Sequence, residues 1–475
     1  MGNSFAVIAL MVWPFVAALI FSRTTTVKAI IWTIIGGYLL LPPAVEIPSP
    51  LPVVLNKDTI AVLSALVGTI VSATKDPETP RLEGWVKTLM VIYVFTPVLT
   101  AFANPEPLIE GITYRPGLGP YDGFLGIVAA LVVITPFLLG YRFLSSAEGM
   151  KLLLRSLVVA CLAYAVPMLI EIRLSPQINV WIYGFFAHDF SQAIRYGGFR
   201  PMVFLAHGLW VAMFTAMALI AAAYLMRSKR HLPGHAGRRA IVGGLTVLLV
   251  MCKSLAAIVY GMFFLPLVLL TSARRQILVA SVIAGLVFAY PIGRWMQVVP
   301  TEAISNFALG IDQERGRSLT FRLDNEDLLL DRAVLKPLFG WGGWGRNQVI
   351  DPNSGRYISV TDGEWIVQLT IYGFLGYIGI FGLLCGTVIR MGASAWRWGA
   401  PRRDKGELVV GAISLIMAAS LIDLIPNATL TTLTWLCAGA LAGNAARLAQ
   451  RGPAPDTDAT PAPMAGRRLP LRTIL

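Results

Sequence analysis

The sequence predicts an all-α integral membrane protein with about 12 to 13 transmembrane helices and one large external loop that carries short helices. Hydrophobic residues make up 56% of the 475 residues and charged residues only 14%, which leaves too little polar surface for an ordinary soluble globule. Apolar runs of membrane-spanning length recur along the chain. Lys and Arg gather in alternate connections between these runs, as they do in multi-pass membrane proteins.

A helix needs about 20 mostly apolar residues to cross a hydrocarbon core of roughly 30 Å. Each run near this length is predicted to be one span, and the runs that begin near residues 28, 58 and 239 are the shortest. The predicted spans are 4–21, 28–43, 58–73, 84–103, 122–141, 152–171, 201–226, 239–252, 254–271, 275–291, 364–390, 408–424 and 428–446.

The distribution of positive charge predicts the orientation, because Lys and Arg in short connections remain cytoplasmic. Most of the 39 Lys and Arg residues lie in alternate connections, starting with the one that contains Arg23 and Lys28. The N-terminus is therefore predicted outside and the C-terminus inside the membrane. The net charge of +13 then faces anionic membrane lipids, and its pattern does not indicate nucleic-acid binding.

The chain divides into four predicted regions. Residues 1–290 form spans with short loops, 291–363 the large periplasmic loop, 364–447 the last spans, and 448–475 a disordered cytoplasmic tail rich in Pro and Ala. The four cysteines fall in apolar runs and are expected to be buried thiols. No metal motif is found, so neither a metal nor another cofactor is expected.

A short external connection carries two arginines directly before the span at 201–226. Arg195 and Arg200 enclose Gly197 and Gly198. A guanidinium is permanently charged, and its planar fork of donors matches phosphate oxygens. These arginines are candidates for phosphate binding, or they snorkel at a helix end. His207 is expected to be a satisfied histidine of the bundle.

The large loop contains the remaining candidates. Residues 319–335 predict an amphipathic helix lying against the membrane, because Phe321, Leu328 and Leu335 recur at helical spacing; Arg322 lies near its start. The glycine-rich run at 340–345 could present backbone amides to phosphate. Its Trp341 and Trp344 either contact a glycan or anchor at the membrane interface.

Several of these segments resemble one protein family. Arg195-Tyr-Gly-Gly-Phe-Arg-Pro201 resembles the Arg-x-x-Gly-x-Phe-like loop of the bacterial O-antigen ligase and polymerase superfamily. Arg322 followed by Lys336-Pro-Leu-Phe-Gly-Trp-Gly342 resembles that family's Arg, short helix and Pro-Leu-Leu-Gly-x-Gly element. Asp362 through Gly373 and Gly376 resembles its third element, in which a His-Asn pair usually precedes a Gly-x-x-Gly turn. Lys253-Ser254 is similar to its Ser-Arg or Lys-Ser pair, and the likeness covers about residues 191–382.

The resemblance implies a metal-independent glycosyltransferase of the bacterial inner membrane whose active face is periplasmic. Such enzymes transfer a glycan from an undecaprenyl-diphosphate carrier to an acceptor hydroxyl in O-antigen or exopolysaccharide assembly. Arg195, Arg200 and Arg322 would stabilise the leaving diphosphate. Asp362 would take the acceptor's proton, with Glu364 in reserve; alternatively, Asp362 only caps the following helix.

The resemblance also implies the partners: a lipid-linked oligosaccharide donor, a glycan or lipid A core acceptor, membrane lipids and a chain-length regulator. Asp362 stands where the ligases carry histidine, which favours a repeat-unit polymerase over the alternative, an O-antigen ligase. A polysaccharide or lipid flippase is an alternative of another class. Transporters usually have paired halves and ionisable residues at mid-membrane, whereas here Glu171, Lys253 and Asp423 lie at span ends.

Overall fold

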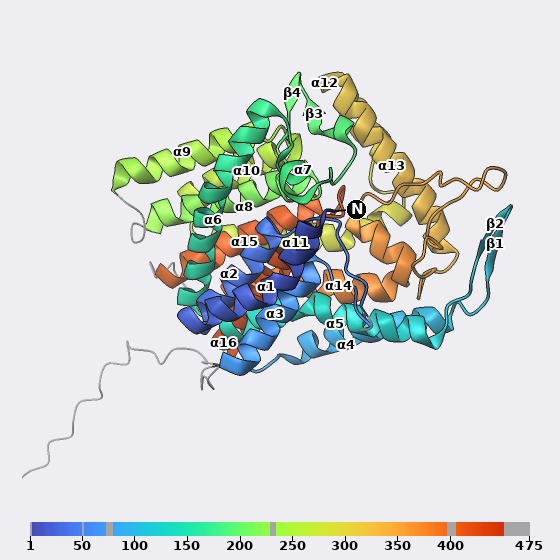
Figure 1. Cartoon of the computed structure of the whole chain (residues 1–475), viewed down its shortest axis with the longest axis horizontal. Coiled ribbons are helices and arrows are strands. Elements are labelled where there is room, and N and C mark those ends of the chain that lie inside the picture. Colours follow the sequence, from blue (N-terminus) through green and yellow to red (C-terminus); the bar gives the residue numbers. More distant parts are fainter. Residues whose placement is uncertain (1, 50–51, 73–78, 229–233, 397–404, 451–475) are drawn as a thin grey trace, which may run out of the picture.

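The computed structural model describes residues 2–49, 52–72, 79–228, 234–396 and 405–450. Within them the chain is mostly helical (Figure 1), and every predicted span coincides with a helix. These helices are α1 (Ser4–Arg23), α2 (Thr26–Leu40), α3 (Lys57–Ser72), α4 (Gly84–Phe102), α5 (Pro120–Phe143), α6 (Ala147–Leu174), α8 (Gly208–Ser228), α9 (His235–Met251), α10 (Leu255–Leu270), α11 (Ala273–Trp295), α14 (Glu364–Trp396), α15 (Lys405–Asp423) and α16 (Thr432–Gln450).

Shorter elements lie in the connections between these helices. They are α7 (Ile178–Tyr183), η1 (Phe190–Ala193), α12 (Thr301–Ile311) and α13 (Gln313–Val334). Two antiparallel hairpins complete the described fold. One pairs β1 (Leu108–Glu110) with β2 (Thr113–Arg115), and the other pairs β3 (Ile194–Arg195) with β4 (Gly198–Phe199).

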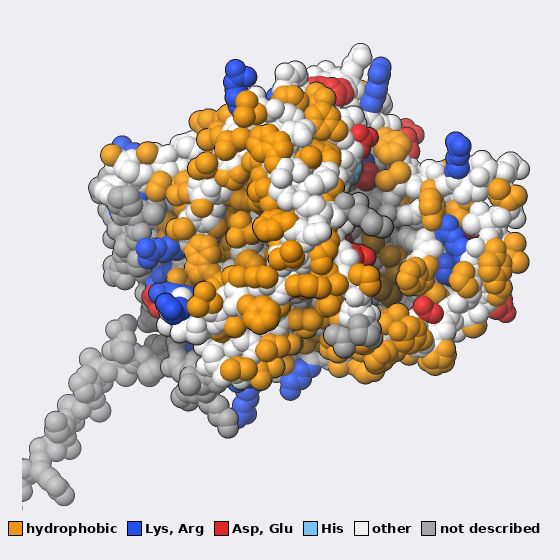
Figure 2. Space-filling view, viewed as in Figure 1, with side chains coloured by type: hydrophobic (Ala, Val, Ile, Leu, Met, Phe, Trp, Pro, Cys, Tyr) orange, Lys and Arg blue, Asp and Glu red, His pale blue; other side chains and the backbone are white. Residues whose placement is uncertain are grey.

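The helices are those of a multi-pass membrane protein. Among the described residues, seven helices are long and apolar enough to cross a membrane: α1, α4, α5, α6, α8, α11 and α14. Large apolar side chains are exposed, including Phe15 (75%), Val71 (82%) and Leu270 (80%), and hydrophobic side chains cover much of the face in Figure 2. Such a surface suits lipid contact. The crossings predicted for the other helices remain predictions.

Hydrogen bonds join connections that the charge pattern placed on the same side. At one end, Lys57 Nζ donates to the Phe204 carbonyl and Asn104 Nδ2 to the Gly340 carbonyl. At the other, Asn444 Nδ2 donates to the Ser145 carbonyl. We call the first end, with connections 41–56, 103–119, 175–207, 296–363 and 424–431, the loop end. Lys75, Lys229, Arg402 and the predicted tail after Gln450 lie outside the described residues.

Several predicted boundaries differ from those of the helices by four or more residues, and two of these differences lie near the candidate site. The span predicted from residue 201 begins only at Gly208, because the buried Glu171 carboxylate accepts the amides of Met202 and Val203 (both 2.8 Å) and holds them in a turn. The large loop was predicted from Pro291, but α11 continues to Trp295.

The helix predicted at 319–335 is confirmed as helical and begins earlier, at Gln313. The stripe was predicted to lie against the membrane, and that contact remains a prediction. Phe321, Leu328 and Leu335 are exposed, whereas Leu323, Leu330 and Ala333 are buried. The four cysteines are buried free thiols, as predicted.

Helix α14 is broken at Gly373, where the loop from Pro337 to Gly342 inserts beside it. Gly373 has φ 67°, which is not helical. The amide of Phe374 donates to the Pro337 carbonyl (2.7 Å), and the amides of Trp341 and Gly342 donate to the carbonyls of Thr370 and Ile371 (both 2.9 Å). The inserted loop therefore satisfies the backbone groups that the break exposes, as a break within a membrane helix requires.

Gly373→Ala is expected to lower the thermal stability of the purified protein. The positive φ alone costs about 1–3 kcal/mol for a residue with a Cβ, and that Cβ would also overlap the Leu338 carbonyl. The melting temperature measured in detergent should be clearly lower than that of the native protein. Gly343→Ala is the control, because a Cβ there meets nothing within 4 Å; equal melting of the two variants would contradict the inserted-loop geometry.

Candidate functional site

The three predicted phosphate-binding arginines meet at the loop end. Arg195 lies in the β3–β4 hairpin, Arg200 follows that hairpin, and Arg322 comes from α13. All three lie close enough to His207 to act on its charge. The fold thus brings the two polar connections of the sequence into one cationic cluster.

Arg200 is the most unusual member of the cluster. Its side chain packs against Gly208 at the start of α8 and is only 5% exposed. Its buried Nε has no hydrogen-bond partner, and no described carboxylate pairs with it. Burial, followed by the charge of Arg195, lowers the pKa of Arg200 to about 10, so it remains charged at neutral pH. An unpaired buried charge destabilises a protein strongly, which points to an anionic ligand.

Arg195 is positioned by a tight turn and by Lys253. Tyr196 (φ 49°) and Gly197 (φ 64°) occupy the centre of the hairpin, as a two-residue type I′ turn requires. Lys253 Nζ donates to the Arg195 carbonyl (2.8 Å). The Arg195 guanidinium pairs with Glu314 of α13 (2.8 Å). Because this pair is exposed, it is weak, and a ligand anion can replace Glu314.

Arg322 lies next to the predicted base. Its Nε is 3.6 Å from Asp362 Oδ2, and its Nη1 donates to Asn427 Oδ1 (3.0 Å). The alternative capping role of Asp362 has no support among the described residues, because no amide in the first turn of α14 donates to its carboxylate; the amide of Glu364 donates to the Leu424 carbonyl (3.0 Å). The Asp362 carboxylate instead faces the arginine.

Glu364 is placed away from the arginines. Its carboxylate is buried and accepts a hydrogen bond from Gln368 Nε2 (2.8 Å). It lies close enough to Tyr93 of α4 to act on that phenol. Of the two predicted carboxylates, therefore, only Asp362 is brought to the cluster.

The two tryptophans of the glycine-rich run differ. Trp341 Nε1 donates to the Arg332 carbonyl (2.8 Å), and the Arg332 and Lys336 cations lie 4.1 and 4.8 Å from the centre of its ring. Trp341 is thus a packing residue in this structure. Trp344 is 74% exposed, so a glycan contact remains a prediction for it. The phosphate role considered for this run does not fit its Trp341 and Gly342 amides, which bind α14.

His207 is a satisfied, neutral histidine, as predicted. Its Nδ1 accepts the Leu209 amide (3.1 Å), and its Nε2 lies 3.0 Å from Gln192 Oε1. Burial, followed by the charge of Arg200, lowers the pKa of His207 to about 3. It therefore lacks a free nitrogen with which to accept a proton near neutral pH.

A buried ion pair fixes α13, and with it Arg322, against the bundle. Arg294 of α11 lies 3.3 Å from Glu326 Oε2 and 2.8 Å from Asp327 Oδ1. Tyr290 and Trp365 also donate to the Glu326 carboxylate (3.0 and 3.2 Å). Burial raises the pKa of Glu326, and the Arg294 charge opposes that rise. Sequence reasoning missed this anchor because its partners are far apart in the chain.

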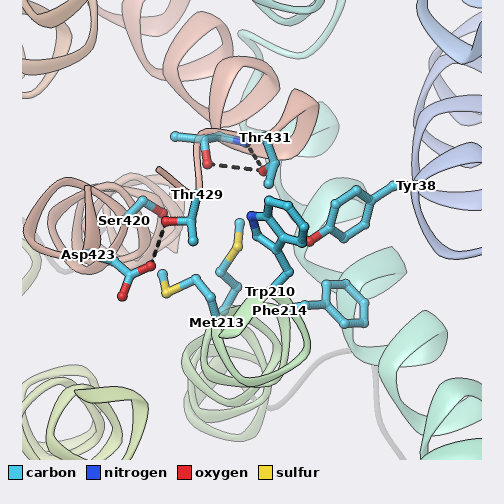
Figure 3. A pocket seen from close by; sticks show the side chains of 10 residues that line it. Tyr38, Trp210, Met213, Phe214, Ser420, Asp423, Thr429 and Thr431 are labelled. Carbon is cyan, nitrogen blue, oxygen red and sulfur yellow. Dashed lines mark hydrogen bonds between the residues drawn. The ribbon is translucent and has the colours of Figure 1, made fainter. Parts of the chain in front are cut away.

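Sequence reasoning also missed the role of a second polar group, which is linked to Arg322 through Asn427. The buried Asp423 carboxylate accepts hydrogen bonds from Asn427 Nδ2 (3.1 Å), Thr429 Oγ1 (2.7 Å) and Tyr260 (3.3 Å). Asp423 and Thr429 line a small cavity beside Trp210 (Figure 3), with room for about one water molecule. The signal available in the sequence was the pair Asp423 and Asn427, four residues apart at a span end.

No protein-family model and no curated protein sequence match the chain. The chemistry of the cluster is therefore inferred from its residues. Among the described residues, no group of three or more His, Cys, Asp or Glu side chains could hold a metal ion. Guanidinium groups in poorly hydrated surroundings bind phosphate oxygens directly, and the adjacent carboxylate can accept a proton.

Proposed function

We propose that this protein is a membrane glycosyltransferase that uses an undecaprenyl-diphosphate-linked glycan as donor in surface polysaccharide assembly. The observation that carries the proposal is Arg200, a buried and unpaired guanidinium beside Arg195 and Arg322. Such a cluster suits a ligand with several negative charges. We propose the periplasmic side for the loop end, where the positive-inside pattern places it.

An apolar groove supports a lipid-linked donor. It lies between the end of α11, the end of α13 and the break in α14, and it is lined by Trp295, Leu330, Ala333, Val334, Pro337, Leu369 and Phe374. Two of these helices are candidate membrane spans, and α13 also carries Arg322. A prenyl chain can occupy an apolar groove beside the helix that binds its diphosphate.

In the proposed reaction, the acceptor hydroxyl forms a bond to the anomeric carbon of the donor glycan. The bond from that carbon to the carrier diphosphate breaks, and the diphosphate leaves with the bonding electrons. Arg195, Arg200 and Arg322 stabilise the charge that develops on it. Asp362 takes the acceptor's proton. We propose repeat-unit polymerisation, because Asp362 replaces the histidine of the ligases that the chain resembles; the ligase reaction is the alternative.

Arg200→Met is expected to weaken anion binding without lowering the melting temperature. Methionine removes an unpaired buried charge and keeps much of the apolar volume, so the ligand-free protein should melt at the same or a higher temperature. Its dissociation constant for inorganic pyrophosphate and for undecaprenyl diphosphate should rise about 30-fold or more, because a buried charge partner is lost. Both quantities are measured on protein in lipid nanodiscs.

The control is Arg173→Met, which removes an exposed arginine in the last turn of α6, next to the loop end and outside the cluster. It should leave both dissociation constants unchanged. If Arg200→Met melts at a lower temperature and binds pyrophosphate as the native protein does, then Arg200 is a packing residue and the proposed anion site is wrong.

A further inference from the structure

The short connection between α15 and α16 contacts Arg322 of the proposed anion site. It supplies Asn427, whose Oδ1 accepts a hydrogen bond from Arg322 Nη1 (3.0 Å). The same amide donates through Nδ2 to Asp423 Oδ1 (3.1 Å). Asn427 therefore lies between a guanidinium, which can only donate, and a carboxylate, which accepts. Only one orientation of the Asn427 amide satisfies both neighbours.

Asp423 holds that amide in place. The carboxylate is only 4% exposed, and Tyr260 of α10 and Thr429 also donate to it (3.3 and 2.7 Å). Figure 3 shows the Thr429 contact at the end of α15. With three donors, the Asp423 carboxylate is a fixed acceptor, so the position of Asn427 is determined by two further helices and not by Arg322 alone.

A neutral amide at this place has a consequence for the charge of Arg322. A second carboxylate, in addition to Asp362, would neutralise the guanidinium further and compete with a ligand anion. Asn427 fixes the direction of Nη1 without adding negative charge. Asp362 approaches on the Nε side at 3.6 Å. No described residue takes a hydrogen bond from Nη2, which leaves that nitrogen for a ligand.

We propose that Asn427 and Asp423 are positioning residues, which hold the Arg322 guanidinium in the orientation in which it binds the diphosphate of the donor. This inference rests on the proposed function of the arginine cluster. It adds a loop that lies outside the segment resembling a known family, and it gives Asn427 a role that neither Asp nor an apolar residue can fill.

A double-mutant cycle with Arg322 tests the inference. The dissociation constant for inorganic pyrophosphate is measured in nanodiscs for the native protein, Asn427→Leu, Arg322→Ala and the double variant. Asn427→Leu should weaken binding about tenfold or more, which is the range for one hydrogen bond to a charged group. In the Arg322→Ala background the same substitution should have almost no effect, because the residue that it positions is gone.

Asn427→Asp is the second variant and keeps the size of the side chain. It should also weaken pyrophosphate binding, because a carboxylate then pairs with Arg322. Thr431→Val controls for loss of structure, since Thr431 belongs to the same connection and contacts Thr434 instead of Arg322; it should leave the dissociation constant unchanged. If Asn427→Leu does not fold, the dissociation constant of Asn427→Asp for pyrophosphate tests the positioning role by itself.

The outcomes separate this inference from the proposed function. If Arg322→Ala leaves pyrophosphate binding unchanged, the proposed anion site is wrong. If Arg322→Ala weakens binding while both Asn427 variants bind normally, only the positioning role is wrong. Equal effects of Asn427→Leu with and without Arg322 also overturn it, because they indicate a general structural role for the loop.

Discussion

Arg322→Lys is expected to lower polymer production about 10²- to 10³-fold at a normal membrane level of the protein, as loss of one positioned donor typically does. Lysine keeps the charge but loses the planar fork. One ammonium cannot keep the Arg322 contacts to Asn427 and Asp362 and present a further fixed nitrogen to phosphate. The measurement is the surface polysaccharide profile of a deletion strain that carries the variant, with protein levels followed by immunoblot.

Arg317→Lys is the matched control, because Arg317 is an exposed arginine on the same helix. It should support normal polysaccharide. The profile of the inactive strain also distinguishes the two proposed reactions. Lipid A core that carries a single repeat indicates a polymerase, and polymer that remains on its lipid carrier indicates a ligase. Full activity of Arg322→Lys would contradict a bidentate role for this arginine.

The helical architecture could be predicted because the length and composition of apolar runs determine membrane helices nearly independently of tertiary contacts. The same argument failed where side chains from other elements form hydrogen bonds with backbone groups and thereby replace helical ones. Residues 201–206 are apolar, yet Glu171 accepts two of their amides and Lys57 donates to one of their carbonyls. Periodicity predicted an apolar stripe on α13, but it did not show that Leu323, Leu330 and Ala333 pack on the protein. Exposure of Phe321 and Leu328 carries little cost beside a membrane, so an apolar stripe there does not indicate the protein core.

The arginines of the site could be predicted from residue type, whereas their supports could not. A guanidinium beside glycines at a predicted membrane surface is a candidate for phosphate binding, with snorkelling at a helix end as the alternative. The contacts that fix it are tertiary: Asn427 is 105 residues from Arg322, and Glu314 is 119 residues from Arg195. The inserted loop at Gly373 is similar, since neither Gly340 nor Gly373 alone indicates that its partner fills the break. Such pairs have no signature in a single sequence.

Asp362→Asn is expected to reduce the transfer rate about 10²-fold or more, within the range for loss of a general base. Asparagine keeps the size of the side chain and an oxygen that can face Arg322, but it cannot take the acceptor's proton. It also removes a negative charge 3.6 Å from Arg322 Nε. The dissociation constant for inorganic pyrophosphate should therefore stay the same or fall while polymer production is lost. A residue that only held Arg322 in place would show the opposite result, with weaker pyrophosphate binding.

Glu364→Gln provides the comparison, because Glu364 is buried against Gln368 and lies away from the cluster. It should retain polymer production at a normal protein level. If Asp362→Asn retains full production and Glu364→Gln abolishes it, the base is Glu364, and the acceptor must reach the site from the side of α4. If both variants are fully active, neither carboxylate takes the proton and the proposed chemistry is wrong.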